Sequence, residues 1–301
     1  MFSAPNNPRA RFHIFGTTFA MNGFLNHLAL TLRLNFRNKQ AMVFGYLVPV
    51  FFLFAFGSLY PSEKIPLRRE LGQVLTISTL GGACFGLPVA LVTERERGVW
   101  RRYRLAPLAT GWFVASSMLA RFLIVATSAL LQIVLAMSIY KTPLPEHPLQ
   151  LIVAFAFVSF AFLGMGLVIA MVANSAGAVQ ALGQAIFLPM IIIGGVGVRL
   201  QSLPHWAQHV AGFLPGRYAV EAMNKCVMDT KGEPEGLRGA VFQLIALTVI
   251  GLAACLIGSK LFRWENEQKS GRAAKWWVLL GLSSWAAVGL AAEYMHVIKP
   301  V

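Results

Sequence analysis

The sequence predicts an all-α membrane protein, and three observations support this class. Of the 301 residues, 56% are hydrophobic and 13% are charged, whereas charged residues make up about a quarter of a typical soluble domain. The mean hydropathy is +0.62. Several apolar runs contain the ~20 residues that a helix needs to cross a hydrocarbon core ~30 Å thick, where a helix satisfies its own backbone groups.

The net charge of +14 does not indicate nucleic-acid binding. The basic residues lie in short loops beside the apolar runs, where positive-inside topology and anionic lipid account for them. The three cysteines, Cys84, Cys226 and Cys255, form no CxxC pair, so neither a disulfide framework nor a metal site is predicted. We therefore expect membrane lipid, and no nucleic acid, among the partners of the chain.

Six membrane spans follow from the lengths of the apolar runs and from the charges that end them. They cover residues 42–60, 71–93, 122–140, 149–172, 181–198 and 240–262. Pro49 predicts a kink in the first span, and Gly82 and Gly86, at GxxxG spacing, predict a close helix contact in the second. Residues 42–262 are therefore expected to form one six-span domain.

Arg121 makes the start of the third span ambiguous, because the apolar run around it is 30 residues long. An arginine buried within the bilayer is costly and would mark a functional site. Alternatively, the 19 residues from Phe122 to Tyr140 form a helix of about 28 Å, and Arg121 lies at the cytosolic interface. We favour the second interpretation, in which residues 111–120 lie along the membrane surface.

Both ends of the chain flank this domain. Residues 1–41 are expected to form a cytosolic tail and an interfacial helix, with no cleavable signal peptide before the first span. After a polar loop, residues 276–292 form an apolar run of 17 residues, the short end of the range for a span. Because Trp276, Trp277 and Tyr294 resemble interfacial anchors, we favour a seventh span within residues 263–301 over a surface helix.

The distribution of basic residues predicts the orientation. With the N-terminus in the cytosol, the cytosolic segments contain 15 Lys and Arg residues and the outer segments contain 10. This bias favours that orientation and predicts a multi-pass protein of the bacterial cytoplasmic membrane. Residues 93–108, "TERERGVWRRYRLAPL", then lie on the cytosolic side, whereas residues 199–238 lie outside.

No catalytic motif is present. Gly81 and Gly86 have the separation of a phosphate-binding loop, but Leu87 stands where that loop needs lysine. His205 and His209 are four residues apart without the glutamate of a zinc-protease motif. Ion-coupled transporters usually need a carboxylate or histidine within the bilayer, and the six predicted spans contain none. We therefore expect no enzymatic activity and an energy source outside this chain.

Residues 93–108 gather five arginines and two glutamates. The segment can form a short charged helix whose Val99, Trp100 and Tyr103 face lipid or protein, or a solvated loop whose arginines lie near lipid phosphate. The order of the residues in this segment is more informative than its amino-acid composition. Acidic and basic residues come first, followed by Gly98, an aromatic and basic turn, and then "LAPL".

This order resembles the ABC-2 family of ABC transporter permeases, the membrane subunits of type V (ABCG-like) exporters. The family's Glu-Arg-Glu-x-Gly motif corresponds to residues 94–98, and its basic stretch and proline correspond to Arg101, Arg102, Arg104 and Pro107. Downstream, "SLPHWAQHVAGFLP" and "PGRYAVEAMNK" are similar to family sequence after the fifth span. Together with the six spans, the resemblance covers residues 22–265.

The resemblance implies a mechanism. Two permease copies pair, as a homodimer or with a related chain, and each is coupled to a separate ATPase subunit that binds ATP and Mg²⁺. This chain itself is expected to bind no cofactor. The coupling helix lies within residues 94–108. Its ATPase-coupling residues are Glu94, Arg95, Glu96, Arg97, Gly98, Arg101, Arg102 and Arg104.

The resemblance also implies an amphipathic elbow helix on the cytosolic face, and residues 22–39 occupy its place. One apolar face opposes a basic one; the residues are Leu25, Leu28, Leu32 and Phe36, opposite Arg33 and Arg37. The alternating leucines would also fit a strand, but an unpaired strand at a membrane surface has no partner for its backbone groups.

At the outer end, short re-entrant or interfacial helices within residues 199–238 are implied to cap the exit. The cap residues are Trp206, Phe213, Pro215 and Tyr218. The chain departs from the family at Leu214, where Asn is common, and at Val198 and Arg199, where an aromatic-Pro pair is common. The expected seventh span is a larger departure.

These expectations define the permease subunit of an ATP-driven exporter. One alternative is an ATP-independent secondary transporter or channel, whose transport would survive removal of any ATPase. Another is a membrane anchor or scaffold. The Phe, Met, Leu and small residues of the spans suit a drug, a lipid or a lipid-linked glycan alike.

Overall fold

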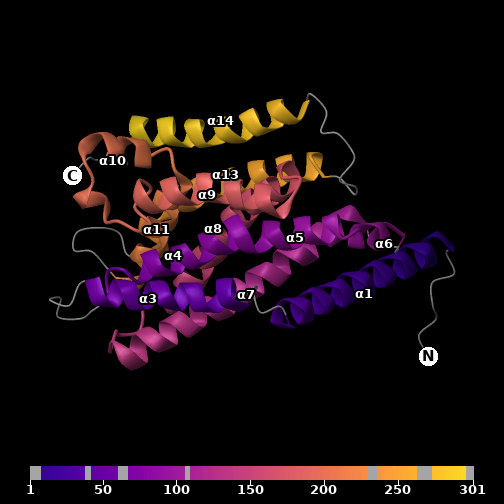
Figure 1. Ribbon diagram of the computed structural model, residues 1–301, viewed down its shortest axis with the longest axis horizontal. Coiled ribbons are helices and arrows are strands. Elements are labelled where there is room, and N and C mark those ends of the chain that lie inside the picture. Colours follow the sequence, from indigo (N-terminus) through magenta and orange to yellow (C-terminus); the bar gives the residue numbers. More distant parts are fainter. Residues whose placement is uncertain are drawn as a thin grey trace.

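The computed structural model describes residues 8–37, 42–59, 67–105, 109–228, 236–262 and 273–295. These residues form an elongated bundle of helices without a strand, and most of the long helices run along its length (Figure 1). The elements are α1 (Pro8–Arg37), the π-helical turn η1 (Val43–Leu47), α3 (Val48–Leu59), α4 (Leu71–Gly81), the π-helical turn η2 (Gly82–Gly86), α5 (Leu87–Glu96), α6 (Val99–Leu105), α7 (Thr110–Ile139), α8 (Pro148–Val172), α9 (Ala176–Ile192), the 3-10 turn η3 (Leu200–Ser202), α10 (His205–Ala211), α11 (Pro215–Val227), α12 (Gly236–Gly239), α13 (Val241–Lys260) and α14 (Ala273–Tyr294).

Each of the six predicted spans coincides with a helix. Among the described residues, four helices are long and apolar enough to cross a membrane: Leu71–Glu96, Thr110–Ile139, Pro148–Val172 and Val241–Lys260. Two shorter apolar helices, Gly45–Leu59 and Ala176–Ile192, correspond to the first and fifth spans. The fifth helix begins five residues earlier than predicted and ends at Ile192 rather than at residue 198.

The favoured interpretation of the third span is wrong. A single helix, α7, runs from Thr110 to Ile139, so residues 111–120 form no separate surface segment. Arg121 is 4% exposed and packs against Gly82 and Gly86 in the middle of the second span. The length of an apolar run could not reveal this, because the space for the arginine comes from two glycines on a neighbouring helix.

The α4–η2–α5 helix lies at the centre of the bundle, and α7, α8 and α9 approach it closely. A Cβ added to Gly82 would lie 2.5 Å from Val125 Cγ2 of α7. A Cβ on Gly183 of α9 would lie 2.7 Å from the carbonyl oxygen of Cys84. On α8, a Cβ on Gly166 would overlap the Ala83 carbonyl. The predicted close contact at the GxxxG pair is therefore confirmed, and it is made with α7.

Each π-helical turn lies just before a proline. In η1 the N–H of Val48 donates to the carbonyl of Val43, and in η2 the N–H of Leu87 donates to the carbonyl of Gly82. Pro49 and Pro88 follow directly. Because proline lacks an N–H and its ring clashes with the carbonyl four residues back, the wider π turn accommodates it within a continuous helix.

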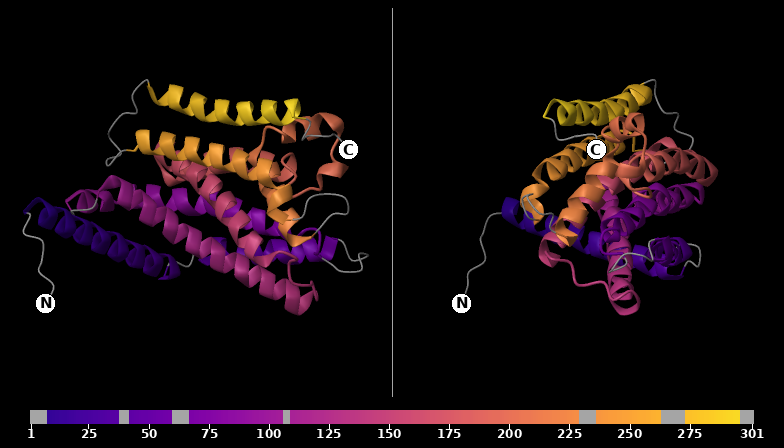
Figure 2. Two further views of the ribbon diagram at one scale, coloured as in Figure 1. Left: turned by 180° about the vertical axis from the view of Figure 1, so that it is seen from behind. Right: turned by 90° about the vertical axis from the view of Figure 1, so that its left-hand side faces the viewer.

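The predicted cytosolic and outer segments lie at opposite ends of the bundle (Figures 1 and 2). At one end, called the α6 end, α6 lies beside α1 and the last turn of α13. At the other, called the α10 end, α11 packs against α4, and α10 lies near the last turn of α14. Helix α14 packs along α13, and near its last turn Glu293 Oε1 lies 3.7 Å from His209 Nδ1 of α10.

The expected elbow is helical and longer than predicted, since α1 begins at Pro8. It packs against α7 through Phe24, whose ring meets Trp112 edge-to-face at 5.5 Å, and through buried His27 and Thr31. On the predicted apolar face, Leu25 and Phe36 are about half exposed. That face therefore lies beside the packing surface and is available for lipid contact.

Candidate functional site

The predicted coupling segment consists of two helices joined by a turn. Helix α5 ends at Glu96, residues 97–98 turn, and α6 begins at Val99. Gly98 has a φ of +68°, a left-handed conformation that costs an L-residue roughly 1–2 kcal/mol. The glycine of the motif is therefore explained by backbone geometry.

Arg95 lies inside the bundle. Its side chain is 4% exposed and donates hydrogen bonds to the carbonyls of Ala170 and Ala173, at the C-terminal end of α8. The guanidinium carbon also lies 5.6 Å from the centre of the Trp100 ring. Helix C-termini carry unpaired carbonyls and partial negative charge, which a cation stabilises. Arg95 thus attaches α5 to α8, although the motif grouped it with surface residues.

Trp100 anchors α6 to the bundle. It is completely buried, stacks on Phe262 after α13 with ring centres 5.2 Å apart, and meets Phe113 of α7 edge-to-face at 5.2 Å. Burying a tryptophan removes about 150–250 Å² of surface from water, and paired aromatic rings add further stabilisation. The sequence left lipid and protein as alternative surroundings for Trp100, and in the structure Trp100 packs against protein.

Four other charged side chains of the segment face outward. Glu96, Arg97, Arg101 and Arg102 are exposed at the α6 end, and Glu94 is half-buried. The side chain of Arg104 and residues 106–108, including Pro107, lie outside the described residues. The α6 end therefore presents one acidic and three basic side chains beside each other on a braced helical turn.

His27 connects the elbow, the coupling segment and the third span. Its Nδ1 lies 2.7 Å from Ser116 Oγ of α7, and its ring lies 5.0 Å from Tyr103 of α6 and 4.9 Å from Phe113. Burial lowers the pKa of His27 to about 4, so the ring is neutral at physiological pH. Sequence analysis missed His27, because a single histidine within a helix has no distinguishing pattern.

The pKa of Tyr103 depends on the neighbouring Glu94. Burial and the neighbouring Glu94 carboxylate raise the pKa of Tyr103 to about 12, so the phenol remains protonated. The glutamate therefore lies near Tyr103 of α6. Glu94 and Glu96, two residues apart, have different surroundings.

Of the four predicted outer-cap residues, Trp206 is exposed, Phe213 is half-buried, and Pro215 and Tyr218 are buried. Trp206 is 62% exposed, whereas Tyr218 is 1% exposed, and the Tyr218 hydroxyl donates to the carbonyl of Gly212. Pro215 is the buried first residue of α11, and Phe213 packs against Gly289 of α14. Only Trp206 is therefore positioned as an interfacial aromatic residue.

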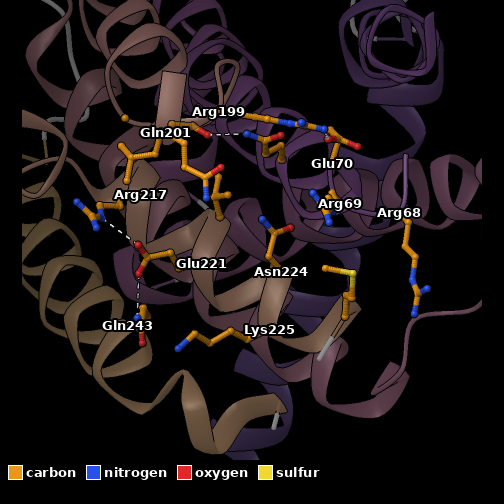
Figure 3. Close-up of a pocket in the computed structure, with 16 residues that line it drawn as sticks. Arg68, Arg69, Glu70, Arg199, Gln201, Arg217, Glu221, Asn224, Lys225 and Gln243 are labelled. Carbon is orange, nitrogen blue, oxygen red and sulfur yellow. Dashed lines mark hydrogen bonds and ion pairs between the residues drawn. The ribbon is translucent and has the colours of Figure 1, made fainter. Parts of the chain in front are cut away.

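Helix α11 lies within the bundle and against α4, α8 and α13. It borders a cavity of about 660 Å³ whose lining includes several charged side chains, shown in Figure 3. The cavity is lined by residues from the start of α4, the loop after α9, α11 and α13. Arg199, one of the departures from the family pattern, lies here and forms an ion pair with Glu70. The sequence did not predict a site among these residues.

A bundle of membrane-length helices, with a charged turn at one end and short helices at the other, defines a multi-pass membrane protein. The family model of the ABC-2 type transporter matches residues 14–228, and the chain belongs to that family. No curated protein matches it. The resemblance is thereby confirmed. The chain is the transmembrane permease component of an ABC transporter, and not its catalytic ATPase.

Proposed function

We propose that the chain is the permease of an ATP-driven exporter and that its α6 end binds a separate ABC ATPase subunit. The observation that carries this proposal is the exposure of Glu96, Arg97, Arg101 and Arg102 on a turn whose Arg95 and Trp100 are buried. Exposed charges on a braced turn suit electrostatic docking, because complementary charges fix the orientation of a partner. ATP and Mg²⁺ would be bound by that partner.

The packing around the turn supports a path for mechanical coupling. Helix α5 continues through η2 into α4 in the centre of the bundle, so a shift of the turn moves the second span directly. Trp100 joins the turn to Phe262, and Arg95 joins it to α8. Packed interiors respond to a displacement as rigid units, so motion of the ATPase would reach three spans.

Helix α9 supports the expected pairing with a second permease copy. Its outward face carries Gln180, Ala181, Gln184 and Ala185, all exposed, and Leu188 is 47% exposed. Small residues four apart let membrane helices approach closely, and glutamine amides hydrogen-bond across such interfaces. We expect Ala185→Cys to form a disulfide-linked dimer on oxidation and Leu130→Cys, exposed on α7, to remain monomeric. The reverse pattern would reject this interface.

The orientation is proposed from the same contacts. A cytosolic ATPase requires the α6 end to face the cytosol, with the N-terminus on that side and the α10 end outside the cytoplasmic membrane. Helix α14, 22 residues long, would then return to the outer side as a seventh span. Its side-by-side packing with α13 supports this assignment. Its composition does not place it among the four strongly apolar helices.

Site-specific photocrosslinking in intact cells tests the ATPase partner. A photoreactive amino acid at position 97 or 101 is expected to form an adduct with an ABC ATPase, identified by mass spectrometry. The same probe at position 206, at the opposite end, is the matched control and should yield none. Adducts without an ATPase at positions 97 and 101, or ATPase adducts at position 206, would contradict the assignment.

A further inference from the structure

Arg121 carries a charge within the membrane spans. It belongs to α7, is 4% exposed and packs against Gly82 and Gly86, in the middle of the helix Leu71–Glu96. Its Nε has no hydrogen-bond partner, and no ion pair involves Arg121 among the described residues. The six predicted spans contain no carboxylate. A counter-charge for Arg121 therefore has to come from outside the spans.

The packing of the second and third spans preserves space for this charge. A Cβ on Gly86 would overlap the Arg121 guanidinium, and a Cβ on Gly82 would lie 3.5 Å from its Nε. Moving an unpaired charge into a region of low dielectric is unfavourable, and ionisable residues within membrane spans are rare and mark functional sites. A purely structural contact between two apolar helices needs no arginine, so the charge indicates a ligand of opposite sign.

Two hydroxyl groups at the surface of the bundle lie near Arg121. The hydroxyls of Tyr46 in η1 and Thr127 in α7 are 2.7 Å apart. Thr127 is exposed and Tyr46 is half-buried, and Tyr46 is close enough to Arg121 for an electrostatic interaction. Around them the exposed side chains of the first and third spans are apolar, for example Leu47 and Leu123. The two hydroxyls therefore form a polar patch on a surface that faces lipid.

The helix beside this patch is irregular. The π-helical turn η1 contacts both α7 and η2, so the two π-helical turns and α7 meet around Arg121. A Cβ on Gly45 of η1 would lie 3.5 Å from Ile124, one helical turn from Arg121. Turns of this kind are rare and are frequently found at functional sites. Movement of η1 away from α7 would open the space between them and expose Arg121 to the lipid.

We propose that Arg121 binds the anionic group, a phosphate or a carboxylate, of a membrane amphiphile that enters from the lipid between η1 and α7. The planar guanidinium presents paired N–H donors that match either group. The hydroxyls of Tyr46 and Thr127 offer hydrogen bonds at the entrance. The proposal rests on the proposed function for the role of the ligand, which is either the exported cargo or a resident phospholipid, and it adds the chemical class of that ligand.

Photocrosslinking of the purified full-length permease in a neutral detergent, without any ATPase, tests the site. A photoreactive amino acid replaces Leu47 of η1, which is 61% exposed, or Leu130 of α7, which is 62% exposed and serves as the matched control. At position 47, dioleoyl phosphatidylglycerol should give at least about tenfold more adduct than dioleoylglycerol, which lacks the phosphate. At position 130 the two lipids should react equally.

Two substitutions of Arg121 separate charge from structure. Arg121→Met removes the charge and should lower the phosphatidylglycerol adduct at position 47 about 30-fold, which corresponds to about 2 kcal/mol. Arg121→Lys keeps the charge but loses the paired donors, and should lower it about threefold. Because Arg121→Met replaces an unpaired buried charge by an apolar side chain, its unfolding temperature should be at least that of the wild type. Misfolding would then not explain its loss of binding.

Three results would overturn the proposal. The first is equal adduct formation by the two lipids at position 47 of the wild type, a comparison that requires no Arg121 variant to fold. The second is an unchanged phosphatidylglycerol adduct in Arg121→Met. The third is a loss in Arg121→Lys as large as that in Arg121→Met, because a structural role of the guanidinium would then account for both.

Proteoliposomes that contain the permease with its ATPase then distinguish the two sources of the anionic group. If the ligand is cargo, phosphatidylglycerol stimulates ATP hydrolysis and moves between leaflets in a manner that requires ATP and Arg121. If it is a resident phospholipid, binding occurs without either effect. Both outcomes support the site. Because crosslinking is measured on the permease alone, a failure of ATPase coupling would contradict the proposed function and leave the binding result intact.

Discussion

Gly86 and Arg121 provide a sharp test of how the second and third spans pack. A Cβ added to Gly86 would overlap three atoms of the Arg121 guanidinium. Because Arg121 is 4% exposed, it has little room to withdraw. Overpacking of this kind costs about 1–3 kcal/mol, whereas Gly to Ala within a helix gains about 0.5–1 kcal/mol. We therefore expect Gly86→Ala to destabilise the protein by about 1–2 kcal/mol.

A double-mutant cycle isolates the contact. In an Arg121→Ala background the space is free, so Gly86→Ala should stabilise by about 0.5–1 kcal/mol from helix propensity alone. The expected coupling energy is then about 2 kcal/mol. Unfolding in detergent, followed by circular dichroism and by maleimide labelling of buried Cys84, measures each free energy.

Gly81 is the matched control. It lies in the same helix, and a Cβ there would meet no atom within 4 Å. Gly81→Ala should therefore be neutral or stabilising in both backgrounds. If Gly86→Ala behaves like Gly81→Ala while Arg121 is present, then Arg121 does not occupy the space beside Gly86, and its burial within the second and third spans is refuted.

Three further predictions concern the two ends of the bundle. Arg95→Met should lower the stability of the protein by about 1–3 kcal/mol, because two carbonyls at the end of α8 lose their donor. Arg97→Met, at an exposed position, should change the stability by less than about 0.5 kcal/mol. Equal effects of the two substitutions would argue that Arg95 does not cap α8. The pKa of His27 falls from 6.5 to about 4 on folding, so docking of α1 contributes its full stability above pH 6.5 and loses about 1–3 kcal/mol as the pH falls towards 4. Hydrogen exchange of α1 measures this loss, which should disappear in His27→Gln. Trp206→Cys should react with an impermeant maleimide added to intact cells and Arg101→Cys should not; the opposite labelling would invert the proposed orientation.

The approximate positions of the apolar helices could be predicted from sequence, because the bilayer imposes a minimum helix length and loop charges end most of the runs. The charged segment at residues 93–108 was equally visible, since charge within so apolar a chain is conspicuous. The place of α14 relative to the membrane was less accessible, because a run of 17 apolar residues is marginal for a span.

By itself, the sequence determined the class of the protein, the order of its helices and the identity of its charged segment, because these depend on composition and local spacing. Only the tertiary structure decided which charges are available. Arg95 and Arg97 are two residues apart, yet one caps α8 and the other is exposed, because the helix ends between them. Arg121 is buried rather than interfacial because glycines on another helix make room for it. The cavity at the α10 end likewise exists only where the start of α4, the loop after α9, α11 and α13 meet, and no one-dimensional pattern records such a meeting.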